Sequence, residues 1–156
     1  MEESTKTTIE EQTLRATLSH ISSVSDLIVD IKECPSDMEL MAKIGQLYNG
    51  AMGTVAFQKK DRNGFDALYQ AIALIENTCR LYEAPGFSEV DEEHILFVER
   101  CGRFVNNLIS ELLERKFDDS HWEGLAKLAE DYAFLSDVRD RENLGQDDVD
   151  KLLGDL

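Results

Sequence analysis

The chain has 156 residues, 42% of them hydrophobic and 31% charged, a balance typical of one globular domain rather than of a disordered chain. Thirty-two acidic against sixteen basic residues give a formal charge of −16, which would repel the phosphates of a nucleic acid and of an anionic membrane surface, so we expect neither as a partner. No run approaches the roughly 18 apolar residues of a membrane span and no apolar signal core opens the chain, so a cytoplasmic protein is expected.

Apolar residues recur at steps of three, four and seven along nearly the whole chain, which is the spacing of amphipathic helices. The first such segment carries apolar residues from Leu14 to Ile31, and we expect Pro35 to end it. The second opens at Ser36, a candidate N-cap, and carries an apolar stripe as far as Val55.

Three further helices are expected after these two. A turn signal at 61–64 precedes a third helix with an apolar stripe over residues 65–82, and Ala-Pro-Gly at 84–86 breaks it. A fourth helix is expected over 88–112, and a fifth carries apolar residues through 122–135. No alternating strand pattern competes with these assignments.

Long helical segments with short connections predict an all-α fold, an antiparallel helical bundle of about five helices over residues 1–135. Its heptad-like seams would also suit pairing between subunits, so a homodimer stays open.

Cys79 and Cys101 lie on the apolar stripes and are expected to be buried hydrophobic residues. Residues 136–143 are mostly charged, which indicates a frayed helix end or a tether.

The last 13 residues, 144–156, have the pattern of a short amphipathic helix. Acidic residues stand in its first turn, where the helix dipole favours them. A segment of this length is marginal as an isolated helix, because about 12–15 residues are usually needed, so it requires a groove on its own bundle or on a partner. One face of this helix would carry its four spaced apolar residues, Val149, Leu152, Leu153 and Leu156.

Gln-Asp-Asp-Val-Asp-Lys-Leu-Leu at residues 146–153 resembles the C-terminal peptide of the chemotaxis phosphatase CheZ family, and is similar to the N-terminal peptide of the flagellar switch protein FliM. Both of those peptides dock as helices on the phosphorylated response regulator CheY. The resemblance implies that this tail binds a CheY-like regulator. The residues expected to bind are Gln146, Asp147, Asp148, Val149, Asp150, Leu152, Leu153 and Leu156.

The same resemblance implies a catalytic pair, because CheZ-type phosphatases use an Asp and a Gln four residues apart on a bundle helix. Asp66 and Gln70 have this spacing, which places both side chains on one surface of the third helix, opposite its apolar stripe. By the resemblance, Gln70 would orient the water that attacks the aspartyl-phosphate, and Asp66 would contact the regulator's lysine. Ala67, Leu68 and Tyr69 stand between them, where the family signature has small and hydroxyl residues.

Three functions stay open at this stage. The chain could accelerate dephosphorylation of a CheY-like regulator, whose own Mg²⁺ and acids would complete the site. It could instead be a non-catalytic adaptor or sink that uses the same tail. Alternatively, its tail could simply pack on its own bundle. No cofactor of the chain itself and no metal site are expected, because His20, His94 and His121 lack ligand-like spacing. We expect these histidines in surface or capping roles.

Overall fold

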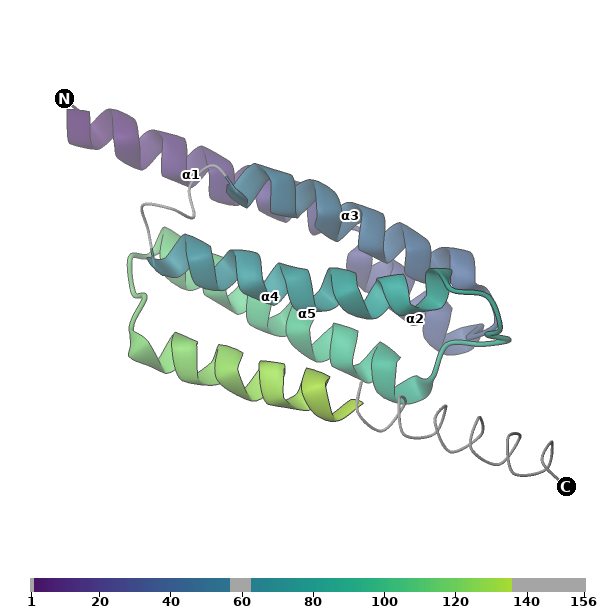
Figure 1. Ribbon diagram of the computed structural model, residues 1–156. Coiled ribbons are helices and arrows are strands. Elements are labelled where there is room, and N and C mark those ends of the chain that lie inside the picture. Colours follow the sequence, from purple (N-terminus) through teal and green to yellow (C-terminus); the bar gives the residue numbers. More distant parts are fainter. Residues whose placement is uncertain (1, 57–62, 136–156) are drawn as a thin grey trace, which may run out of the picture.

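The computed structural model describes residues 2–56 and 63–135, and over these ranges the chain is helical with no strand, as the sequence predicts. A further helix, which carries no label in Figure 1, occupies residues 119–135. The helices labelled there are α1 (Glu2–Ile21), α2 (Val24–Glu33), α3 (Met38–Ala56), α4 (Asn63–Arg80) and α5 (Glu92–Leu113), and a short 3₁₀ turn, η1 (Leu81–Glu83), follows α4.

The first helix differs from the sequence prediction at both of its ends. It begins at Glu2, well before the first apolar position, and a turn at residues 22–23 separates it from α2, where one helix was expected to run on to Pro35. The Ser22 hydroxyl donates to the Ser19 carbonyl at 3.0 Å. Serine side chains compete in this way for backbone groups, which weakens a helix interior and allows the chain to turn.

Two other helix starts are later than the sequence predicts. Helix α3 starts at Met38 rather than directly after Ser36, and α5 starts at Glu92 rather than near residue 88. Asp91 is the N-cap residue of α5, with an extended backbone. The preceding residue, Val90, is buried and donates its N–H to the Pro35 carbonyl at 2.8 Å, so this loop is tied to the connection before α3 and the helix begins only afterwards.

The helices lie lengthwise beside one another, and consecutive long helices run in opposite directions (Figure 1). Among α1 to α5 the contacts are most extensive between α3 and α4; α1 packs on α3, α5 packs on α4, and the short α2 packs on both α3 and α5. The helix at 119–135 begins at the end of the molecule where α4 begins and finishes at the opposite end (Figure 1).

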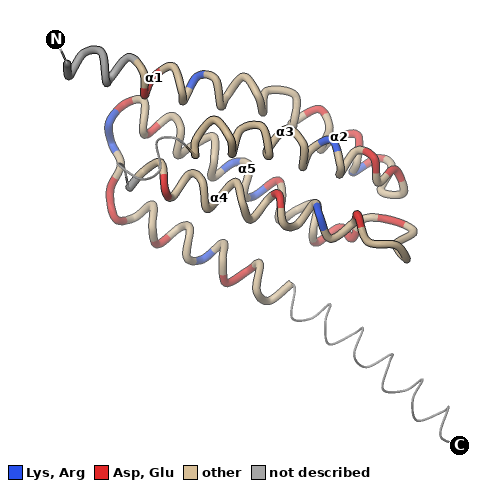
Figure 2. Tube along the Cα trace, turned by 45° about the horizontal axis from the view of Figure 1, so that its top comes forward, with Lys and Arg blue, Asp and Glu red and all other residues tan. Residues whose placement is uncertain are grey.

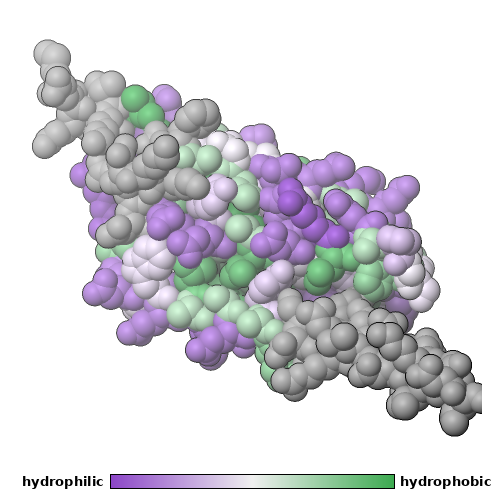
Figure 3. All heavy atoms as spheres, viewed as in Figure 1, coloured by the Kyte–Doolittle hydropathy of each residue, from purple (hydrophilic) through white to green (hydrophobic). Residues whose placement is uncertain are grey.

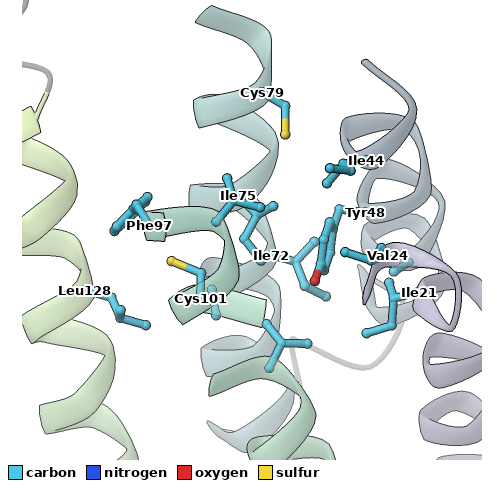
Figure 4. Close-up of a cluster of buried hydrophobic side chains, with 14 of the residues drawn as sticks. Ile21, Val24, Ile44, Tyr48, Ile72, Ile75, Cys79, Phe97, Cys101 and Leu128 are labelled. Carbon is cyan, nitrogen blue, oxygen red and sulfur yellow. The ribbon is translucent and has the colours of Figure 1, made fainter. Parts of the chain in front are cut away.

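Aliphatic and aromatic side chains from several helices meet in the core (Figure 4). Tyr48 of α3, Ile72 of α4 and Phe97 of α5 are almost fully enclosed, and Leu128 closes the core from the last described helix. Cys79 and Cys101 are buried there, as predicted from their positions on the stripes. Burial raises the pKa of each thiol from 9.0 to about 12.

In the view of Figure 3 hydrophilic residues cover most of the visible face, with hydrophobic ones between them. Asp and Glu are spread along the described part of the chain (Figure 2). Within the described ranges no helix has the length and apolar character needed to cross a membrane.

Candidate functional site

Asp66 and Gln70 lie one turn apart near the start of α4, as their spacing predicts. Gln70 is exposed and Asp66 is half-buried, while Ala67, Leu68 and Ala71 between and beside them are enclosed in the core. The pair therefore stands on the outer side of a helix whose inner side is fixed by packing.

The start of α4 is fixed by close contact with the end of α5. A Cβ added at Gly64 would clash with Leu112 Cδ2 and lie 3.4 Å from Phe117 Cδ2, so the Leu112 side chain would have to move to admit it. Phe65, the next residue, is 3% exposed. These contacts hold the first turn of α4, and with it Asp66, against the rest of the molecule.

The two polar side chains contact each other directly. Gln70 Nε2 donates to Asp66 Oδ2 at 3.4 Å, longer than the 2.7–3.2 Å of most N–H···O bonds. A long bond on an exposed face is weak, because water competes for both groups. The amide of Gln70 is thus held only weakly by Asp66 and is available to a partner at little cost. Asn77, also exposed, lies seven residues further along α4.

A second polar cluster on α4 was not anticipated from the sequence. Glu76 is 4% exposed and forms an ion pair with Arg80, one turn further on. They line a pocket of about 80 Å³ between α3 and α4, to which Gln46 and Asn49 of α3 contribute amides. The i, i+4 spacing of Glu76 and Arg80 could have predicted the ion pair, but nothing in the sequence predicts that its acid is buried. The pocket lies further along α4 than Gln70, so the two features form separate sites.

The histidines are only partly where the sequence predicts them. His20 is exposed, and His121 Nδ1 accepts from the Asp118 N–H at 3.1 Å at the start of the last described helix, which is a capping role. The prediction is wrong for His94, which is 4% exposed. Its Nδ1 lies 2.6 Å from the Tyr82 hydroxyl, which also accepts from the Asp91 N–H at 3.0 Å. This cluster ties η1 to the first turn of α5. His94 stands four residues before Val98 of the apolar stripe, and this spacing could have predicted that His94 is buried.

The predicted partner-binding residues of the tail, 146–156, lie outside the described residues, as does the tether at 136–143. Within the described residues no group of three or more His, Cys, Asp or Glu side chains is arranged to hold a metal ion. No protein-family model matches this chain, and neither the curated proteins nor the solved structures contain a significant match to it.

Proposed function

We propose that the chain binds a CheY-like response regulator through residues 144–156 and accelerates hydrolysis of the regulator's aspartyl-phosphate. In this proposal residues 1–135 form an antiparallel bundle that presents Asp66 and Gln70, and residues 136–143 tether the binding peptide to it. The observation that carries the catalytic part is the exposed amide of Gln70, one turn from Asp66 on a helix anchored in the core.

Hydrolysis of the aspartyl-phosphate requires few groups from this chain. A response regulator supplies the phosphorylated aspartate, the surrounding acids and a bound Mg²⁺, so the missing contribution is an in-line water held in place. A carboxamide suits that task, because its oxygen accepts from the water while its nitrogen donates to a neighbouring acceptor. Asp66 would contact the regulator's active-site lysine, for which the half-buried carboxylate provides the opposite charge.

The alternative is a non-catalytic adaptor or sink that uses the same tail. It is favoured by the three residues between Asp66 and Gln70, since the bulk of Tyr69 beside the pair differs from the family signature. The two functions make different demands on the same chain. Both require the tail for binding, but only the phosphatase requires Gln70.

Phosphate release from a phosphorylated CheY-type regulator separates them. With Gln70→Ala we expect the acceleration to fall about 100-fold, the scale of a lost positioning group, with regulator binding unchanged. Asn77→Ala is the matched control, because it removes an exposed amide from the same helix and should leave the rate as it is. Full acceleration in Gln70→Ala would show that another group positions the water.

Removal of residues 144–156 tests the partner itself. We expect binding to be lost and, at low regulator concentration, acceleration with it. If the intact chain binds the regulator but leaves its phosphate lifetime unchanged, the adaptor function is correct. If the removal changes neither binding nor lifetime, the tail has another role and both partner functions are wrong.

A further inference from the structure

The outer face of α5 lies between two neighbouring helices that are joined to it by ion pairs. Lys32 of α2 lies 2.6 Å from Glu99 Oε2, and on the other side Arg100 lies 2.7 Å from Asp131 in the helix at 119–135. Leu96 and Arg103 occupy the middle of this face and are exposed. We call these four residues of α5, Leu96, Glu99, Arg100 and Arg103, the outer strip.

The outer strip differs in charge from the rest of the molecule. Three basic residues, Lys32, Arg100 and Arg103, gather at or beside it with two acids, although acids outnumber bases two to one in the whole chain. Arg103 is the most exposed of them, with a side chain 73% accessible and only a long 3.8 Å pair to Glu99. Such a pair contributes little, so Arg103 is available to another carboxylate.

Apolar side chains are exposed around the same place. Among the described residues four large hydrophobic side chains are well exposed, and three of them lie one helical turn from the ion pairs of the outer strip. These are Leu96 itself at 40%, Val29 of α2 at 55% and Phe134 of the last described helix at 67%. An occupant of this surface should therefore combine apolar side chains with acids, as an acidic amphipathic helix does.

The described part of the chain ends beside this surface. Phe97 and Tyr132 have ring centroids 6.1 Å apart, so residue 135 lies one turn beyond a residue in contact with the start of α5. Eight tether residues, 136–143, reach at most about 26–29 Å from there. A helix of the 13 residues 144–156 would be about 20 Å long, close to the length of α5 from Leu96 to Ser110.

We infer that residues 144–156 dock in cis on the outer strip of α5. Val149, Leu152 and Leu153 would contact Leu96, Val29 and Phe134, and the acids at 148 and 150, which flank this apolar face, would lie beside Arg100 and Arg103. A short tether gives the tail an effective concentration of order millimolar at this surface, so weak contacts suffice. The docked tail covers the apolar face that a partner would bind, and free and docked tails exchange. The competition between this docking and the binding of a partner rests on the proposed function, whereas the docking itself does not.

Paramagnetic broadening in the full-length protein tests the docking without any regulator. Cys34 is exposed whereas Cys79 and Cys101 are buried, so a nitroxide on Gly154→Cys in a Cys34→Ser background labels the tail alone. We expect broadening of the backbone amides at 96–110, while α4 around Gln70 stays sharp. Arg103→Glu should reduce the broadening about two- to fivefold, the scale of an exposed charge pair, and Leu96→Ser should reduce it too.

The matched control is Arg15→Glu, which reverses the same charge at an arginine of similar exposure that is also paired with an acid one turn before it. It should leave the broadening unchanged. Uniform or absent broadening of residues 96–110, or equal loss in the control, would overturn the inference. Broadening of isotope-labelled chains by separate spin-labelled chains would also overturn it, and would make the outer strip an interface between two copies.

Discussion

The three cysteines illustrate how burial alone sets the behaviour of a residue. Cys34 is exposed at the end of α2, whereas Cys79 and Cys101 lie in the core. The thiolate is the reactive form, and burial raises the pKa of both core thiols to about 12, so almost none is present near neutral pH.

We therefore predict that one thiol of the folded protein reacts rapidly with an alkylating reagent at pH 8 and that two more react only after denaturation. Cys34→Ser should remove the fast phase and leave the two slow ones. Intact mass after timed quenching would count the modified thiols. Rapid modification of all three in the native protein would contradict the buried assignment.

The same pKa shifts predict how stability depends on pH. The folded state holds the protons of Cys79 and Cys101 more tightly than the unfolded state, so their contribution is complete below about pH 9 and is lost as pH rises toward 12. We expect the free energy of unfolding to fall by about 1 kcal/mol per pH unit for each thiol in this window. Urea midpoints measured from pH 8 to 10.5 would test this, and a constant midpoint would contradict it.

At the scale of the elements, the contact between α3 and α4 decides how firmly the candidate site is held. A Cβ at Gly45 of α3 would lie 3.0 Å from Cys79 Cβ, an atom bonded directly to the α4 backbone. The two helices must separate to admit it. Gly53, two turns along α3, is exposed and would meet nothing within 4 Å.

These two glycines form a matched pair for a stability measurement. Gly53→Ala should raise the free energy of unfolding by up to about 1 kcal/mol, because alanine favours helix over glycine. Gly45→Ala gains the same propensity but forces α3 from α4, and we expect a net loss of about 1–2 kcal/mol. Chemical denaturation of both variants measures the difference. Equal stabilisation by both would show that α3 and α4 can separate without cost.

The sequence predicts the helices well because their apolar periodicity is strong, and it places Asp66 and Gln70 on an exposed face for the same reason. It misses the local turn at residues 22–23, and it fails again where the cause is a contact distant in the sequence. The late start of α5 depends on the Val90–Pro35 hydrogen bond, and the burial of Glu76 depends on its place beside α3. Periodicity in one helix cannot specify which polar residue the neighbouring helix covers.

At the scale of the whole molecule, the candidate site and the end of the described chain are far apart. The Asp66–Gln70 pair stands near the start of α4, and the helix at 119–135 finishes at the other end of the molecule (Figure 1). From Gln70 to the end of α4 at Arg80 is ten residues, or about 15 Å along the axis. A regulator bound by the tail must be brought back over this length before Gln70 can reach its phosphate.

The tether at 136–143 therefore sets whether binding and catalysis act on one regulator. Its eight residues reach at most about 26–29 Å, which covers the required distance, whereas the two left after deletion of 137–142 reach about 7 Å and do not. We expect this deletion to preserve regulator binding and to abolish accelerated phosphate release.

A Gly/Ser replacement of the same six residues is the control for composition, and it should retain most of the acceleration because it keeps the reach. Binding by fluorescence anisotropy and phosphate release would be measured on the same preparations. If the deleted chain still accelerates release, then a regulator bound through the tail of one chain must meet the Gln70 of another, and the catalytic unit contains two copies.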